Sequence, residues 1–340
     1  MQAKSSNSQS RVPLTSENPF AAAGTWYRGN THTHSVASDG KMTVIELAEW
    51  YEQQGYDFLC ITDHGLVADL DQSASSSIVL IPGAEIVFQS DQAIGGEICA
   101  LGIEEVRRES VPAQLIIEDV LVQGGLPFMN HPHQSGVSSE LMMEMKGLLG
   151  IEVFNASYYG MGQRGFSLTQ WDELLSAGKR TLGIAADDRH TANDDSPYNP
   201  SGFDRAKGWV MVRARDRTVQ GLVDAMAKGM FYSATGPKIH DIQVTANEIV
   251  VCTSPVKSIR FATIPWCGTE AVAKDGEMLT QARIPLDSVG TPDRCGQVVD
   301  FFVEKGLLTK PAELGAYFRV ECWDGQEGWA WSNPIYFESL

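Results

Sequence analysis

Three side chains near the start of the chain have the types and the spacing of a metal-binding group. His32 and His34 are separated by one residue, and Asp39 follows them. Residues two apart in an extended strand share a side, so both imidazoles can face one ion, and the following loop can return the carboxylate to it. Divalent ions bound in this way activate water for hydrolysis. Taken alone, a His-x-His pair is a weak signal.

Further histidines and carboxylates recur at the ends of short apolar runs. Glu85 stands inside such a run, where an unpaired charge is costly unless a cation balances it. An isolated Asp63-His64 pair could also be a structural hydrogen bond. Their recurrence at successive strand ends, where barrels display catalytic groups, predicts one shared metal site. The positions are Asp63, His64, Glu85, His131, Asp188 and His190.

Apolar runs that alternate with helical patterns are the elements that must position these groups. A capping-box spacing at Thr43 and Glu46 predicts a helix that Gly55 ends. The alternation indicates an α/β fold with a mostly parallel sheet, closed into a barrel. The predicted strands span residues 57–62, 78–88, 98–103, 126–130, 151–155, 181–186 and 209–212, and further helices span residues 112–124, 169–178 and 218–229.

The sequence pattern changes after Gly236-Pro237, from alternating strands and helices to successive strand-like runs with turns between them. This pattern predicts a small antiparallel β-sandwich. We therefore expect a flexible leader at residues 1–24, a barrel at residues 25–237 and the sandwich at residues 238–340. The predicted strands of the sandwich span residues 239–252, 258–264, 281–286, 298–303, 317–323 and 329–337, with one short helix near residues 310–314.

Composition narrows the function further. The 340 residues carry a formal net charge of −17, which disfavours binding to long nucleic acid or to an anionic membrane but permits one small anionic substrate. The six cysteines have no CxxC spacing, so we expect buried thiols in a cytoplasmic protein. The sequence leaves a homo-oligomer open.

In their order, these motifs resemble the polymerase and histidinol phosphatase (PHP) family of metal-dependent phosphoesterases. The resemblance covers about residues 27–237 and implies a distorted (β/α)7 barrel with two or three divalent ions, such as Mn, Zn or Fe. The ligand sets that it implies are His32, His34, Glu85 and Asp188 for one ion, Glu85 and His131 for a second, and Asp39, His64 and His190 for a third.

One position departs from the family pattern. Many members have a histidine at the start of the strand after the bridging glutamate, whereas this chain has Glu97. Glu97 could bind the second ion through oxygen, which would favour Mn²⁺ or Fe²⁺ over Zn²⁺, or it could be an acid beside the ligands. We favour ligation.

Residues around the expected site have candidate roles in hydrolysis by a hydroxide that bridges two ions. His133 is a candidate proton donor, His190 is another only if it is not bound to metal, and Asp188 is a catalytic ligand. The amide of Asn155 could meet a substrate oxygen, and Asp187 could support a ligating histidine. Phosphate oxygens could be bound by cations that could also be ordinary surface charges, namely Arg164, Arg189, Arg205 and Lys207.

Three functions remain open at this point. The first is a phosphoesterase for a small, anionic phosphomonoester or phosphodiester. The second is a carbamate, amide or carboxylic ester hydrolase, because motifs such as Glu152-Val-Phe-Asn155 resemble a two-domain branch that includes carbamate hydrolases. Arginines facing the ions would favour the first function, and a scarcity of cations would favour the second. The third, a metal-bound scaffold without activity, is disfavoured by the near-complete ligand set.

Overall fold

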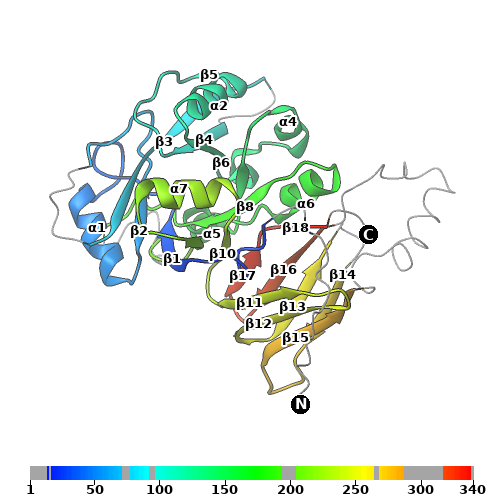
Figure 1. Ribbon diagram of the computed structural model, residues 1–340. Helices are drawn as coiled ribbons and strands as arrows, with labels where there is room; N and C mark the ends of the chain where they lie inside the picture. The colour runs from blue at the N-terminus through cyan, green and yellow to red at the C-terminus, as the bar shows by residue number, and fades with distance from the viewer. Residues whose placement is uncertain are drawn as a thin grey trace, which may run out of the picture.

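The computed structural model of the chain describes residues 14, 17–70, 77–91, 96–192, 204–263, 268–286 and 317–337. Figure 1 shows two parts. The helices surround the strands of the first part, and strands without helices form the second part beside it. Within the described residues, no helix combines the length and the apolar character that a membrane crossing requires.

The first part contains every strand and helix predicted for it, with ends that differ by two residues or fewer. Its strands are β1 (Thr25–Asn30), β2 (Phe58–Ile61), β3 (Val79–Gln89), β4 (Gly96–Leu101), β5 (Val111–Pro112), β6 (Leu126–Met129), β7 (Gly150–Asn155), β8 (Leu182–Ala186), β9 (Trp209–Ala214) and β10 (Phe231–Ala234). Its helices are α1 (Val44–Gln53), α2 (Ala113–Val122), α3 (Pro132–Ser135), α4 (Ser139–Glu144), α5 (Ala156–Gly162), α6 (Leu168–Ser176) and α7 (Val219–Ala227).

Helix α1 begins at the predicted capping box. The Glu46 backbone N–H donates to Thr43 Oγ1 at 3.2 Å, and the Thr43 N–H donates to the Glu46 carboxylate at 2.8 Å. After the helix, Gly55 takes a φ of +76°, a left-handed conformation that glycine adopts without steric cost. The prediction for this helix is confirmed at both ends.

The sheet of the first part is mixed, whereas the sequence predicted a mostly parallel one. Its strands are hydrogen-bonded in the order β10-β9-β1-β2-β3-β4-β6-β7-β8. The pairs β1–β2, β2–β3, β6–β7 and β7–β8 are parallel, and the other pairs on this path are antiparallel. The connection from β3 to β4 is too short for the crossover that a parallel pair needs, so these two strands form a hairpin.

Strand β8 meets β10 through side chains. Both backbone polar groups of Gly183 form hydrogen bonds with side chains. Its N–H donates to Asn333 Oδ1 at 2.9 Å, and its carbonyl accepts from Ser233 Oγ at 2.8 Å. Asn333 Nδ2 also donates to the carbonyl of Phe231 at 3.1 Å. The path of strands therefore curves back on itself, but the exact seven-stranded barrel stays a prediction.

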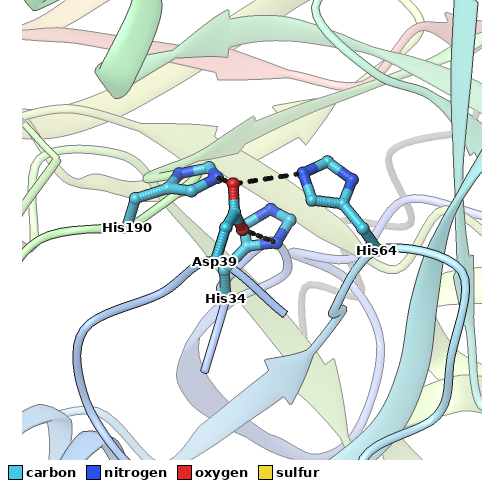
Figure 2. A group of neighbouring side chains, drawn as sticks. All are labelled: His34, Asp39, His64 and His190. Atoms are coloured by element: carbon cyan, nitrogen blue, oxygen red, sulfur yellow. Dashed lines mark ion pairs between the residues drawn. The ribbon is translucent and has the colours of Figure 1, made fainter. Parts of the chain in front are cut away.

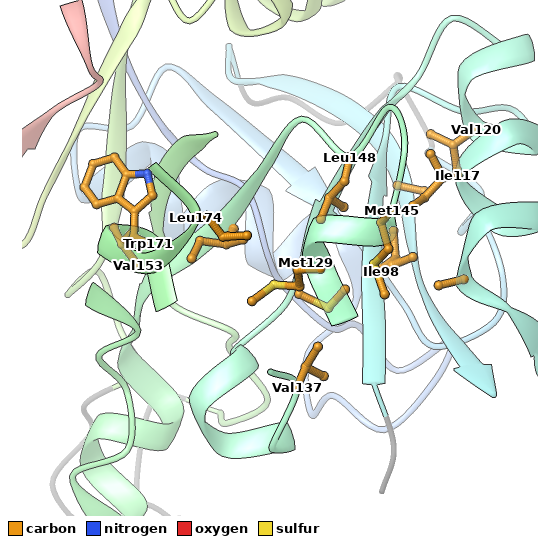
Figure 3. Packing of buried hydrophobic residues seen from close by; sticks show 14 of the residues in the cluster. Ile98, Ile117, Val120, Met129, Val137, Met145, Leu148, Val153, Trp171 and Leu174 are labelled. Atoms are coloured by element: carbon orange, nitrogen blue, oxygen red, sulfur yellow. The ribbon is translucent and has the colours of Figure 1, made fainter. Parts of the chain in front are cut away.

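Apolar side chains of the helices cover the outside of these strands (Figure 3). Ile117 and Val120 of α2 pack in one cluster with Ile98 of β4 and Met129 of β6, all nearly inaccessible to solvent. Trp171 of α6 belongs to the same cluster and is fully buried. This layer fixes the strands that carry the candidate ligands.

The second part is built from antiparallel strands in two layers. One layer has the order β11-β12-β15, and the other joins β14, β13, β16 and β17 and continues through β10 into the first part. Apolar residues of both layers form one buried cluster. The strands are β11 (Ile239–Val244), β12 (Glu248–Val256), β13 (Ser258–Ala262), β14 (Gly268–Val272), β15 (Leu279–Pro285), β16 (Tyr317–Trp323), β17 (Trp329–Ser332) and β18 (Ile335–Tyr336).

Some predictions for the second part need correction. The single strand predicted at residues 239–252 is a hairpin of β11 and β12, whose turn is held by Thr245 without any glycine or proline to mark it. Strand β14 was not predicted. The strand predicted at residues 298–303 and the helix near 310–314 lie outside the described residues. The limits of the two domains stay predictions, because the larger sheet is continuous across them.

The last residues of the predicted leader contact the rest of the chain. Asn18 is buried and its Nδ2 donates to the carbonyl of Ile242 at 2.8 Å, and the Phe20 ring lies 5.0 Å from that of Trp26. A flexible leader is therefore wrong for residues 17–24. Among the described cysteines, Cys60, Cys99 and Cys322 are buried free thiols, as expected, and Cys252 is half-buried.

We expect Asn333→Ala to lower the free energy of unfolding by about 1–3 kcal/mol, because it leaves the buried N–H of Gly183 without its partner. Urea unfolding followed by circular dichroism measures this change. Asn247→Ala is the matched control, since Asn247 is exposed. Equal midpoints for the two variants would show that the Asn333 bond is dispensable.

Candidate metal centre

The candidate ligands converge at one end of the strands. Nine predicted ligands come from β3, β4 and the loops after β1, β2, β6 and β8, and backbone bonds join these loops: His34 N–H donates to the carbonyl of Arg189, and Asp188 N–H to that of His32. Because each parallel strand delivers its next residues to the same edge, distant segments of sequence meet there. The nine are His32, His34, Asp39, His64, Glu85, Glu97, His131, Asp188 and His190.

Glu85 is the centre of this arrangement. Its Oε1 lies 3.3 Å from His32 Nε2 and 3.1 Å from His131 Nε2. Its Oε2 lies 3.3 Å from His34 Nε2 and 3.1 Å from His64 Nδ1. Although burial alone would raise the pKa of Glu85, these histidines hold it well below its usual range. The carboxylate can therefore serve ions on two sides, as predicted for a bridging ligand.

Asp39 lies among three histidines at the more open side (Figure 2). One oxygen lies 3.4 Å from His190 Nε2 and 3.7 Å from His64 Nε2, and the other lies 3.6 Å from His34 Nδ1. The hydrogen bond with His190 is the main cause that lowers the pKa of Asp39. The loop that carries Asp39 is held by Asp63, which accepts bonds from the Ser35 N–H at 2.8 Å and the Ser38 hydroxyl at 2.6 Å.

Donor atoms form three adjoining groups, each within 4.8 Å. His34 belongs to the first and second groups, Glu85 to the second and third, and His64 to the first and third. The groups are His34, Asp39, His64 and His190; His32, His34 and Glu85; and His64, Glu85 and Glu97. Each group could hold a metal ion, and the groups share donors; the number of ions stays a prediction.

Unsatisfied polar atoms indicate that cations fit here. Asp188 Oδ1 and His34 Nδ1 are buried without a hydrogen-bond partner in the described part of the chain. The Nε2 atoms of His32 and His34 lie 3.1 Å apart, and Asp188 Oδ1 lies 3.2 Å from each. Buried polar atoms are rarely left unpaired, and a cation among the two Nε2 atoms and Asp188 Oδ1 would accept the lone pairs that these three atoms direct at one another. The donor set therefore fits divalent ions.

Glu97 is a member of the third group. Its oxygens lie 3.6 Å from His64 Nδ1 and 3.5 Å from His131 Nε2. Burial and the nearby charge of Glu85 raise the pKa of Glu97 to about 7. Ligation by Glu97 stays a prediction, and this position is compatible with it. A cation there would stabilise the ionised carboxylate.

Glu152, which the sequence reasoning did not place in the site, holds the ligands in position. It is fully buried; its Oε1 accepts from His32 Nδ1 at 2.7 Å, and its Oε2 accepts from the backbone N–H of His131 at 2.9 Å. Protonation of His32 at Nδ1 leaves its Nε2 free for an ion. The signal was present in the sequence, because Glu152 interrupts an apolar strand just as Glu85 does.

Asn155 does not face a substrate, contrary to expectation. It is fully buried, and its Nδ2 donates to Glu152 Oε2 at 2.9 Å and to Asp188 Oδ2 at 3.1 Å. Its Oδ1 caps α5 by accepting from the N–H of Tyr158 at 3.1 Å. With its amide engaged in this way, Asn155 orients Asp188 and does not bind substrate.

Asp187 supports backbone and not a histidine, which corrects a second expectation. Its oxygens accept from the N–H groups of Ala206, Lys207 and Gly208 at 2.7–2.8 Å. It also accepts from the Tyr51 hydroxyl at 2.6 Å. Asp187 thus holds residues 206–208, the segment that leads into β9.

The three predicted arginines lie in different surroundings. Arg189 is fully buried against α1, where its Nε donates to the carbonyl of Thr191 and its guanidinium lies 4.0 Å from the Trp50 ring centroid. The expected substrate contact of Arg189 is therefore wrong. Arg205 Nε donates to Thr191 Oγ1 at 3.2 Å, and Arg164 is exposed just after α5. For Arg164 and Arg205, substrate binding stays a prediction.

His133 lies apart from the three donor groups. Its side chain is exposed, and its Nδ1 donates to the carbonyl of Phe166 at 2.8 Å. Tyr158 lies beside a candidate ligand: its ring meets that of His131 edge-on, with centroids 4.7 Å apart. Burial raises the pKa of Tyr158. The sequence reasoning did not identify this tyrosine.

Comparisons with known proteins bear on the fold. No family model and no curated protein matches the chain. A two-domain protein from Bacteroides vulgatus, which contains a predicted PHP-like metal-dependent phosphoesterase, is similar over 98% of this chain and 99% of its own, with 14% identity and a TM-score of 0.50. This likeness shows that the chain has the PHP-like two-domain fold, and at the level of fold the predicted resemblance is confirmed.

Two further solved structures each match between half and three fifths of the chain. One is a Bifidobacterium adolescentis protein described as a metal-dependent phosphoesterase, with 17% identity, a TM-score of 0.41 and coverage of 58% of this chain and 96% of its own. The other is an amidohydrolase from Chromobacterium violaceum with bound sulfate and no metal, with 14% identity, a TM-score of 0.40 and coverage of 50% and 92%.

We expect Glu152→Gln to weaken metal binding by about 10- to 100-fold, because the amide cannot accept from both His32 and the His131 backbone as the carboxylate does. Calorimetric titration of metal-free protein with Mn²⁺ measures this affinity, and circular dichroism checks the fold. The exposed Glu140→Gln is the control. Unchanged affinity in Glu152→Gln would remove this carboxylate from the ligand support.

Metal affinity should rise with pH up to about 9. Burial alone would lower the pKa of His190, but the charges of Asp188 and Asp39 raise it to about 9 in the metal-free protein. Because an ion needs the neutral imidazole, protons compete with metal below this pH. Titrations in two buffers of different ionisation enthalpy measure the protons released. No proton release at neutral pH would contradict this assignment of His190.

Proposed function

We propose that this chain is a metal-dependent hydrolase whose substrate is a small phosphoester. The observation that carries the proposal is the sharing of His34, Glu85 and His64 among three donor groups. One group alone could be a structural site, but adjoining groups with shared ligands are typical of sites that bind ions close together for hydrolysis. The PHP-like fold supports the proposal, since the two-domain protein that shares it contains a predicted phosphoesterase of this kind.

Divalent ions bound here would supply Lewis acidity and a nucleophile at neutral pH. The protein's own residues fix where this chemistry can occur. Asn155 orients Asp188, and Glu152 orients His32, so the ligands are set before substrate arrives. His190, whose Nε2 lies at the open side of the cluster near Asp39, is the better candidate for proton donation than His133 only if it is not bound to metal.

The arginine placement favours a second candidate function, the hydrolysis of a carbamate, amide or carboxylic ester. Arg189 is buried against Trp50 and Met42, and Arg205 contacts Thr191. Transition states at a carbonyl carbon carry less negative charge than a phosphate dianion and need fewer fixed cations.

A substrate panel separates the two functions. Metal-free protein is supplied in turn with Mn²⁺, Fe²⁺ and Zn²⁺ and assayed on an aryl phosphomonoester, an aryl phosphodiester and an aryl carbamate. We expect phosphoester turnover that chelation abolishes and metal restores, and loss of turnover by at least about a thousandfold in Asp188→Ala. The Glu140→Gln variant is the control.

Other results would change the conclusion. Turnover of the carbamate alone would replace the first function with the second. Protein purified without chelators that contains well below one metal ion per chain, and that no added metal activates, would contradict both. Activity retained in Asp188→Ala would move the chemistry elsewhere.

A further inference from the structure

Helix α5 places Tyr158 directly beside a candidate ligand. The Tyr158 ring meets the His131 ring edge-on, with centroids 4.7 Å apart and planes at 65°. The backbone N–H of Tyr158 donates to Asn155 Oδ1, and the Nδ2 of the same amide donates to Asp188. Tyr158 is thus fixed to the ligand shell through both its backbone and its ring.

The hydroxyl of Tyr158, unlike its ring and its backbone, forms no contact that stabilises the fold among the described residues. The structure gives it no hydrogen-bond partner among the described residues, and the side chain is half-buried. Buried tyrosines usually pair their hydroxyls, as Tyr51 does by donating to Asp187 at 2.6 Å. The Tyr158 hydroxyl stands on a ring that contacts His131 and has no hydrogen-bond partner among the described residues, so it is available to a molecule bound at the centre.

The next residue on the helix shows the contrast. Tyr159 turns its ring to the core, where it lies 5.6 Å from Phe154 and 5.4 Å from Phe166. Packing therefore explains Tyr159 but does not explain the orientation of Tyr158 toward His131. Two adjacent tyrosines on one helix provide a matched pair for experiment.

We propose that Tyr158 is a substrate-binding residue whose hydroxyl donates a hydrogen bond to an oxygen of the group under attack, on the His131 side of the centre. The proposal rests on the proposed function. Because an ordinary phenol keeps its proton at neutral pH, it is a neutral donor. Such a donor serves a phosphoryl or a carbonyl oxygen equally.

The test compares Tyr158→Phe with Tyr159→Phe in metal-loaded protein. For Tyr158→Phe we expect kcat/KM to fall at least tenfold and up to about a thousandfold, mainly through kcat, because a donor to the reacting group acts most strongly in the transition state. Metal content and thermal stability should remain those of the parent, which a merely structural role would not allow. Tyr159→Phe should keep kcat/KM within about twofold.

Each result decides the inference. Parental kcat/KM in Tyr158→Phe, or a loss that follows loss of metal, overturns it while the proposed function stands. If the parent hydrolyses no substrate, the proposed function fails, and calorimetry with inorganic phosphate then tests the donor alone: binding at least fivefold weaker in Tyr158→Phe supports it. A parent that neither hydrolyses substrate nor binds phosphate overturns both proposals.

Discussion

Burial of the Glu85 carboxylate is the constraint on which the site depends. Glu85 is 1% exposed, and a charge so far from water must be balanced by cations or donors. The chain provides four imidazoles around it and the Asn130 amide, whose Nδ2 donates to Oε1 at 2.5 Å. These partners come from separate loops, so satisfying one carboxylate fixes the relative positions of several strand ends. The need to balance the buried charge of Glu85 therefore shapes both the site and the arrangement of the strand ends around it.

The sequence predicted the parts of the site that local patterns encode. A carboxylate inside an apolar run and polar residues after strands follow from strand geometry, whereas His32 and His34 lie in the loop after β1 and not within a strand. The structure brings all nine predicted ligands together. The substrate residues were harder to predict, because their roles depend on contacts between distant segments. Arg189 stands beside Asp188 in sequence, yet Trp50 and Met42 of another segment bind it and turn it away.

The fold shows the same division. Strand and helix positions in the first part followed from apolar runs and caps, and their ends agree within two residues. The relative direction of neighbouring strands could not be predicted from these patterns. It depends on whether the connection between two strands is long enough to cross over, as the antiparallel β3–β4 hairpin shows. The hairpin of β11 and β12 was missed for a related reason, since its turn uses Thr245 and Asn247 and lacks the usual glycine.

The link between Gly183 and Asn333 has a consequence for the order in which the chain can fold during synthesis. Domains near the N-terminus usually fold first as the chain emerges. Here β8, which leads directly to Asp188, obtains its last backbone partner from a segment 150 residues later. The Trp331 ring, from the same late segment, packs on Phe154 of β7. The strand that leads to Asp188 therefore obtains this hydrogen bond and this ring contact only after residues 331–333 have been synthesised.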